Sequence, residues 1–83
     1  MDIKVLGSGC ANCDRLEQLV FNVLAELNAD ANVDKVTDFK QIVSYGVIST
    51  PALVINGQVK TAGMVPSKAK LTQIITTELA KQG

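Results

Sequence analysis

The chain contains two cysteines, Cys10 and Cys13, and they lie three positions apart. An apolar, strand-like run ends shortly before them, and a strongly periodic helical pattern begins at Ala11. A thiol at the N-terminus of a helix lies near the positive end of the helix dipole and near unpaired backbone N–H groups, and both favour the thiolate. Because the thiolate is the reactive form of cysteine, this arrangement predicts thiol–disulfide chemistry.

The helical pattern gives the two cysteines different environments. Cys13 is in phase with the apolar positions of the helix, so it should face the core. Cys10 follows Gly7-Ser8-Gly9, a run that can turn sharply and leave the Cys10 sulfur exposed. We therefore predict that Cys10 attacks a substrate disulfide and that Cys13 resolves the mixed disulfide. The apolar positions that share or flank the face of Cys13 are Leu16, Leu19, Val20, Val23, Leu24 and Leu27.

Other interpretations of the cysteine pair remain open. Two thiolates can bind a soft metal ion, and free cysteines often serve as small core residues. A structural zinc site needs four ligands, and a chain with two cysteines and no histidine would need a dimer or carboxylates to complete it. Gly7-Ser8-Gly9 also matches the start of a nucleotide-binding loop, but Asn12 stands where GxGxxG has its third glycine.

Length and composition indicate one domain with a single core, which we place at residues 1–83. Eight basic and eight acidic residues give a net charge of zero, and no basic stripe or aromatic series indicates nucleic-acid binding. No segment approaches the length of a membrane span, and residues 1–6 contain no apolar stretch long enough for a signal peptide. We therefore expect a cytoplasmic location, where a close cysteine pair is more often catalytic or metal-binding than structural.

The first half of the chain predicts two strand–helix units. A short buried strand at 3–6 precedes a helix at 11–27, and a weaker, partly exposed strand at 31–37 suits a sheet edge. Asp38 is the candidate N-cap of a short second helix, and Gly46 is the candidate stop. The buried face of this second helix should carry Phe39, Ile42 and Val43.

The second half predicts a hairpin and a final helix. Asn56-Gly57 accepts the positive φ angles of a type I′ turn and joins strands at 52–55 and 58–62. Ser67 is the candidate cap of the last helix, whose apolar positions are Leu71, Ile74, Ile75 and Leu79. The element order βαβαββα then predicts a four-stranded mixed sheet with helices on both faces.

A CxxC pair at the start of the first helix, with Thr50-Pro51 just before the third strand, resembles the thioredoxin and glutaredoxin fold. More closely, the runs Gly9–Cys13 and Thr50–Gly57 are similar to those of small redox-active disulfide proteins, a thioredoxin-like family of about this length. The resemblance spans the whole chain. It implies an α/β, three-layer thioredoxin-like fold and a thioredoxin- or glutaredoxin-like thiol–disulfide oxidoreductase with no cofactor.

The resemblance also implies a substrate-binding surface beside the cysteines. In such folds the proline that matches Pro51 has a cis peptide bond, and the backbone next to it pairs with bound substrate, which places Thr50 in the site. Gly63 matches a glycine that lets a partner's backbone approach, and a simple turn is an equally good interpretation of it. The implied partners are protein disulfides and a reductase or low-molecular-weight thiol. The protein itself would be a monomer that binds no metal, nucleic acid or membrane.

The main alternative is a heavy-metal-associated domain, a copper or zinc carrier, which also places a CxxC loop between its first strand and first helix. That domain has the order βαββαβ, and Ser8 here replaces a methionine common in it. The chain also departs from thioredoxins, because Ala11-Asn12 stands where they have Gly-Pro between the cysteines. Asp14 and Glu17 fit exposed helix residues better than a buried proton-transferring acid.

Overall fold

The computed structural model describes residues 1–7 and 11–82, so Cys10 lies outside the described residues. Within them the elements follow the order βαβαββα, as the sequence predicts. The strands are β1 (Asp2–Leu6), β2 (Asn32–Val36), β3 (Ala52–Ile55) and β4 (Gln58–Ala62), and the helices are α1 (Ala11–Glu26), α2 (Phe39–Ser44) and α3 (Lys68–Gln82).

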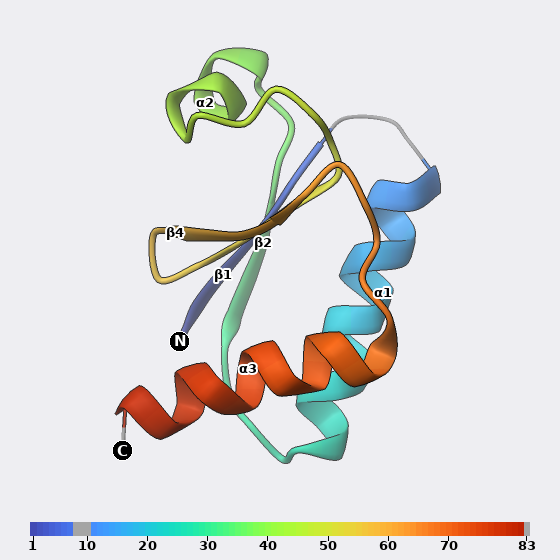
Figure 1. The fold of residues 1–83 in the computed structure, drawn as a ribbon, viewed down its shortest axis with the longest axis vertical. Helices are drawn as coiled ribbons and strands as arrows, with labels where there is room; N and C mark the ends of the chain where they lie inside the picture. Colours follow the sequence, from blue (N-terminus) through green and yellow to red (C-terminus); the bar gives the residue numbers. More distant parts are fainter. Residues whose placement is uncertain (8–10, 83) are drawn as a thin grey trace.

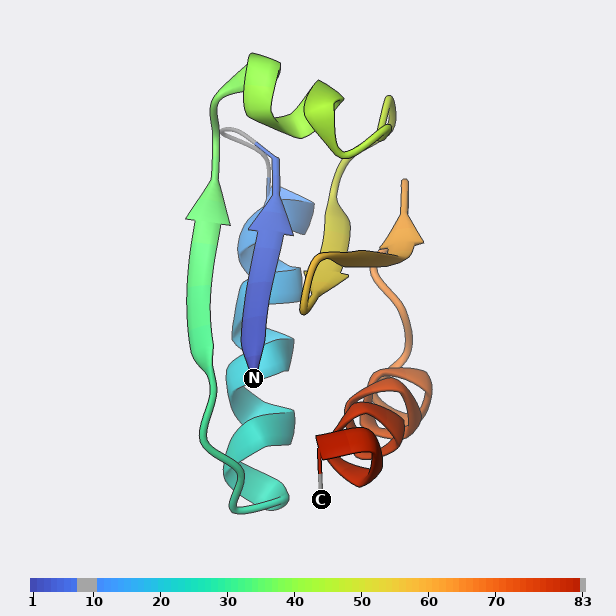
Figure 2. The same ribbon diagram turned by 90° about the vertical axis from the view of Figure 1, so that its left-hand side faces the viewer.

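The strands form a four-stranded mixed sheet in the order β2-β1-β3-β4. β1 pairs in parallel with β2, which follows it through α1, and antiparallel with β3, while β3 and β4 form an antiparallel hairpin. Figure 2 shows β1 flanked by β2 and β3. β2 is therefore an edge strand, which confirms the position expected for the partly exposed segment 31–37.

The larger core lies on the face of the sheet that α1 and α3 cover. Figure 1 shows these two helices together on one side of the sheet, with α2 apart from them. Alternate residues of β1 and β3 point to this face, as the pleat of a strand requires. The fully or nearly buried side chains of this core are Ile3, Val5, Leu16, Val20, Val23, Leu24, Leu53, Ile55, Leu71 and Ile75.

The smaller core lies on the opposite face, beneath α2 and the segment that follows it. All the residues of β3 are buried, because its alternate side chains enter one core or the other. The buried residues of the smaller core are Leu6, Val36, Ile42, Val47, Ala52 and Val54.

The ends of the short helix and of α3 are capped where the sequence predicts. The Asp38 carboxylate accepts a hydrogen bond of 3.0 Å from the backbone N–H of Lys40, and the Ser67 hydroxyl accepts one of 3.1 Å from the N–H of Lys70. Gly46 follows α2 with φ 80°, a left-handed conformation that ends helices. These local predictions are confirmed.

The hairpin turn and an irregularity in β4 position the last strand. Asn56 and Gly57 both have positive φ angles, 51° and 82°, as a type I′ turn requires. The pairing of β3 with β4 shifts between Leu53 and Val54, and the shift leaves Lys60 as the extra residue of a β-bulge. Bulges redirect side chains, and Lys60 of this bulge forms an ion pair with Glu78 on α3.

Candidate active site

Cys13 lies in the first turn of α1, on the helix face that packs into the core. The residue is 1% exposed, which confirms the predicted burial of Cys13. Cys13 is disulfide-bonded in the structure, and the described residues include no free cysteine. Cys10, the predicted nucleophile, lies outside the described residues, so its role stays a prediction.

Gly7 is a site residue that the sequence did not single out. It is buried at the end of β1, and its backbone N–H donates a hydrogen bond of 2.9 Å to the carbonyl of Val36 on β2. Its φ angle is 150°, and a β-carbon at this position would lie 2.3 Å from the Sγ of Cys13. The same β-carbon would lie 3.5 Å from the Cβ of Thr50. From the sequence alone Gly7 is interpreted as a turn residue, because Cys13 and Thr50, which lie beside it in space, are distant from it in the chain.

The segment before β3 brings Thr50 and Pro51 to the same place. The Thr50-Pro51 peptide bond is cis, the isomer that the resemblance implies. Pro51 is buried, whereas Thr50 is exposed and reaches Cys13 through their shared neighbour Gly7. The structure therefore places Cys13 and Thr50 beside the same glycine, and Pro51 directly follows Thr50 in the chain. Their role in substrate binding stays a prediction.

Gly63 packs against the segment that carries the proline. It has φ 78°, and its N–H donates a hydrogen bond of 2.9 Å to the carbonyl of Pro51. A β-carbon on Gly63 would lie 3.0 Å from the Cβ of Ser49, a distance tighter than ordinary packing. Gly63, directly after β4, thus supports the cis-proline segment, and its predicted contact with a partner's backbone stays a prediction.

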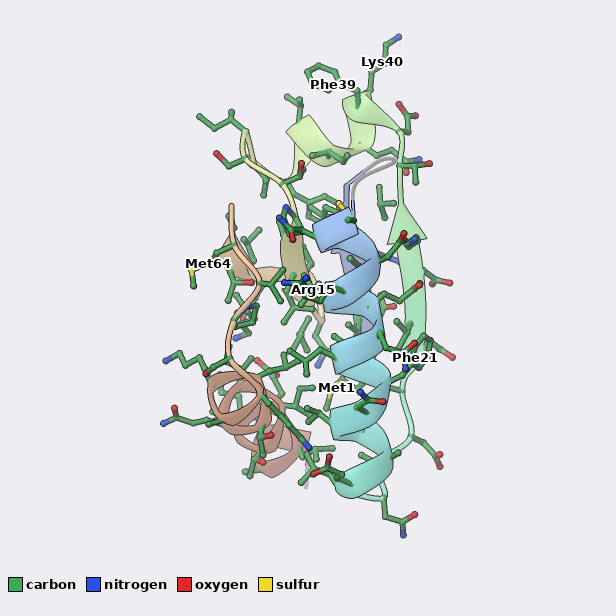
Figure 3. The ribbon with its side chains drawn as sticks, turned by 90° about the vertical axis from the view of Figure 1, so that its right-hand side faces the viewer. Met1, Arg15, Phe21, Phe39, Lys40 and Met64 are labelled. Carbon is green, nitrogen blue, oxygen red and sulfur yellow. The ribbon has the colours of Figure 1, made fainter. Side chains whose placement is uncertain are left out.

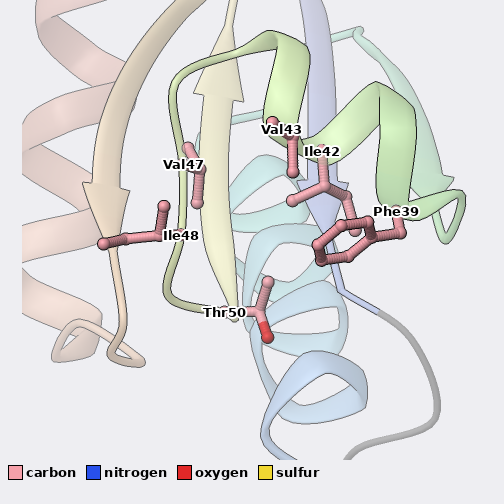
Figure 4. Close-up of a pocket in the computed structure, with 6 residues that line it drawn as sticks. All are labelled: Phe39, Ile42, Val43, Val47, Ile48 and Thr50. Atoms are coloured by element: carbon pink, nitrogen blue, oxygen red, sulfur yellow. The ribbon is translucent and has the colours of Figure 1, made fainter.

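An apolar groove opens between α2 and the segment that leads to Pro51 (Figure 4). Its volume is about 190 Å³. The prediction that Phe39 and Val43 are buried is wrong, because they are 76% and 45% exposed. A helix of six residues presents too narrow a face to bury three large side chains, and only Ile42 of them enters the core. The groove is lined by Phe39, Ile42, Val43, Val47, Ile48 and Thr50.

Ion pairs join α1 to β2, and one of the acids involved, Asp14, directly follows Cys13 in the chain. Lys35 forms ion pairs with Asp14 and, at 3.8 Å, with Glu17. Its hydrogen bond to Asp14 is the main cause that raises the pKa of Lys35 above the ordinary value of 10.5, with partial burial acting in the opposite direction. The side chain of Asp14 is 71% exposed and that of Glu17 is 29% exposed. Asp14 therefore lies at the surface, as predicted, whereas Glu17 is half-buried, and both acids bind the helix to the edge strand.

Glu78 on α3 is a buried acid that the apolar pattern of the last helix did not reveal. Its side chain is 6% exposed, and its Oε1 lies 2.7 Å from the Nζ of Lys60 on β4. The hydrogen bond with Lys60 is the main cause that lowers the pKa of Glu78, and burial opposes it. Asn56 also bonds to Glu78 and donates its N–H to the carbonyl of Asp2, at the start of β1. Glu78 therefore lies at the opposite end of β1 from the position of Cys13.

Several findings bear on the alternatives considered for the cysteine pair. The presence of α2 between β2 and β3 rules out the βαββαβ order of a heavy-metal-associated domain. Among residues 1–7 and 11–82, no three His, Cys, Asp or Glu side chains are grouped so that they could hold a metal ion. Within the same described ranges, no helix has the length and apolar character needed to cross a bilayer.

The β1–α1–β2 unit, the cis proline and the β3–β4 hairpin followed by α3 define a thioredoxin-like α/β fold. Residues 1–76 match the family model described as a thioredoxin domain. The chain is 36% identical over 76 residues to a thioredoxin of Methanothermobacter thermautotrophicus, an alignment that covers 92% of this chain and 99% of that protein. It is 29% identical over 77 residues to a thioredoxin of Methanocaldococcus jannaschii, covering 93% and 88% of the two proteins. The chain belongs to the thioredoxin family, and its activity in general terms is that of a thiol–disulfide oxidoreductase.

Proposed function

We propose that this chain exchanges disulfides with protein substrates through Cys10 and Cys13. The observation that carries the proposal is the placement of Cys13, which is buried in the first turn of α1 against Gly7. Thr50 lies beside the same glycine, and the cis Pro51 follows it in the chain. A sulfur that is sheltered from solvent but next to a substrate-binding segment suits a resolving thiol, which should react with a bound mixed disulfide and not with outside reagents.

The proposed cycle balances as two successive substitutions at sulfur. The Cys10 thiolate attacks one sulfur of the client disulfide, forms a mixed disulfide and expels one client thiolate. The Cys13 thiolate then attacks the Cys10 sulfur, expels the second client thiolate and leaves a disulfide between the two cysteines. The client gains two electrons and the pair loses them. A reductase or a low-molecular-weight thiol then returns the pair to the dithiol form.

The apolar groove supports a polypeptide client. Its volume of about 190 Å³ exceeds the roughly 150 Å³ of an apolar cavity that holds benzene, so it suits one large apolar side chain. Sites for whole cofactors or drug-sized ligands usually start at about 300 Å³. Thr50 lines the groove and precedes Pro51, so a client bound beside the cis proline would extend into it. We place this cycle in the cytoplasm, with the protein acting as a monomer.

A trapping experiment tests the proposal. In Cys13→Ser the first substitution should still occur and the second should be blocked, so mixed disulfides with client proteins should accumulate. The adducts should be released by dithiothreitol and can be identified by mass spectrometry after expression in the native cell.

Cys10→Ser is the matched control, because it keeps the buried cysteine and removes the attacking one. It should capture no clients. Equal capture by both variants, or capture by neither, would contradict the proposed cycle. A metal carrier would show a different pattern, since loss of either thiolate would weaken binding of a soft ion such as monovalent copper to a similar extent.

A further inference from the structure

The sulfur of Cys13 occupies the space that a side chain at position 7 would need. A β-carbon on Gly7 would lie 2.3 Å from the Sγ of Cys13 and 3.4 Å from its Cβ. Non-bonded carbon atoms pack best at about 3.5–4.0 Å, so the first distance is a severe overlap. On its other side the β-carbon would lie 3.5 Å from the Cβ of Thr50. Position 7 therefore has no spare volume between two residues of the proposed site.

Once the disulfide is reduced, the Cys13 sulfur is the neighbour of position 7 that can move with the least change in the backbone. The N–H of Gly7 is bonded to the Val36 carbonyl at 2.9 Å, which ties the end of β1 to β2. Thr50 is joined to the buried Pro51, so its backbone has little freedom to withdraw. An atom added to a close-packed interior forces neighbouring side chains away from their rotamers. The structure shows the Cys13 sulfur where it lies in the disulfide form. In the dithiol form this sulfur can turn about the Cα–Cβ bond, and a side chain at position 7 would displace it from that place.

We propose that Gly7 is a positioning residue for the resolving sulfur, and that it acts through the absence of a side chain. The inference rests on the proposed exchange cycle and adds a residue to it. In the resolving step a bond forms between the sulfurs of Cys13 and Cys10, and the bond between Cys10 and the client sulfur breaks. The client leaves as a thiolate and takes a proton from water. Because this substitution needs the attacking sulfur close to its target, displacement of Cys13 should slow this step and spare the first.

Gly46 provides a control for a glycine with a positive φ angle and open space around it. Gly7 and Gly46 both have positive φ angles, 150° and 80°, so alanine is strained at either position. A β-carbon on Gly46 would meet no atom within 4 Å, whereas one on Gly7 would meet the Cys13 sulfur. Gly46→Ala therefore controls for a positive φ without a steric contact, and the Cys13→Ala background described below separates the contact with the sulfur from the larger backbone strain at Gly7.

The kinetic test uses the reduced protein and the small disulfide 5,5′-dithiobis(2-nitrobenzoate). Attack by Cys10 releases one coloured nitrothiobenzoate, and attack by Cys13 on the mixed disulfide releases the second. Gly7→Ala should release the first at the rate of Gly46→Ala and the second about ten- to a hundredfold more slowly, because misplacing a reacting group by about 1 Å can cost about a hundredfold. Cys13→Ser should release only the first, which identifies the second phase.

The outcomes separate this inference from the proposed function. If the wild-type protein fails to release a second nitrothiobenzoate, the proposed cycle is wrong and the role of Gly7 falls with it. If the wild type releases both and Gly7→Ala matches Gly46→Ala in both phases, only the inference about Gly7 is overturned.

A double-mutant cycle that measures stability tests the inference even if Gly7→Ala folds poorly. In the presence of dithiothreitol, Gly7→Ala should shift the unfolding equilibrium more in the wild-type protein than in Cys13→Ala. The difference should be about tenfold or more, because alanine at position 13 has no sulfur to overlap with the added β-carbon. Gly7→Ala combined with Cys13→Ala should then fold. Failure of that double variant to fold, or an equal shift in both backgrounds, would show that the sulfur is not what excludes a side chain at position 7.

Discussion

The two faces of the sheet are covered in different ways. Over one face lie α1 and α3, helices of sixteen and fifteen residues, and the side chains beneath them are almost fully buried. Over the other face α2 has six residues, and it leaves Phe39 and Ile48 76% and 96% exposed. Because the free energy of folding follows the apolar area removed from water, the first face should carry most of the stability. The second face leaves large apolar side chains exposed.

The ion pairs of the structure show the same contrast. Lys35 joins β2 to α1, Lys60 joins β4 to α3, and Lys68 joins α3 to α1. Among the described residues, the ion pairs include none that ties α2 to another element. The long helices are therefore held by charge as well as by apolar packing, whereas α2 depends on Ile42 and its caps.

Replacing one buried isoleucine by alanine on each face of the sheet tests whether the two faces contribute unequally to stability. Ile75→Ala should lower the free energy of unfolding by about 4 kcal/mol, and Ile42→Ala by about 2 kcal/mol, the upper and lower parts of the range for such deletions. Ile75 is 0% exposed in the larger core, while Ile42 is 6% exposed beside a groove that can relax. Urea unfolding with an unchanged slope would measure both values. Equal losses would mean that the two faces contribute alike.

The buried Glu78, on the face that α1 and α3 cover, should make the stability of the protein depend on pH in the acidic range. The Lys60 hydrogen bond lowers the pKa of Glu78 from its ordinary value of 4.5, so the pair stabilises the fold above pH 4.5. That stability is lost as the pH falls through the lowered pKa. Glu78→Gln should be less stable than the wild type at pH 7, and the difference should shrink on acidification. Glu26→Gln, which removes an acid that is 56% exposed, should change stability much less.

The open face should tolerate polar substitutions that leave stability almost unchanged. Phe39→Ser should change the free energy of unfolding by no more than about 0.5 kcal/mol, because the side chain is already exposed. It should nevertheless slow exchange with a peptide disulfide that carries a large apolar residue, and leave reduction of a small disulfide unchanged. Phe21→Ser is the matched control, since Phe21 is 47% exposed on α1, away from Phe39 (Figure 3). Equal effects of both variants on the peptide would show that the groove does not bind it.

The smallest effect should come from the exposed ion pair at the edge strand. Asp14 raises the pKa of Lys35 above 10.5, so the pair stabilises the fold below pH 10.5, and this contribution is lost as the pH rises through the raised pKa. The alkaline loss of stability should therefore be slightly smaller in Lys35→Gln than in the wild type. Lys40→Gln, which changes an exposed lysine on α2, should follow the wild-type curve. Identical curves for all three proteins would mean that the pair contributes nothing measurable.

Local features of the fold were predictable because their causes lie within a few residues. The positive φ angles of Asn56-Gly57, the cap at Asp38 and the inward face of α1 that includes Cys13 were all evident in the sequence. Each depends on backbone preference or helical periodicity. The exposure of Phe39 and the burial of Glu78 were not predictable in this way. Periodicity marks an apolar face but does not say what covers it, and Glu78 is buried because the bulge at Lys60 supplies a distant partner.

The order of the elements, the spacing of Cys10 and Cys13 and the general chemistry of a close thiol pair at a helix N-terminus follow from the order of the amino acids. The neighbours of the Cys13 sulfur, in contrast, depend on contacts between distant parts of the chain. Gly7, Cys13 and Thr50 come from the end of β1, from α1 and from the segment before β3, and strand pairing brings them together. Close packing then leaves room for the sulfur or for a side chain at position 7, but not for both.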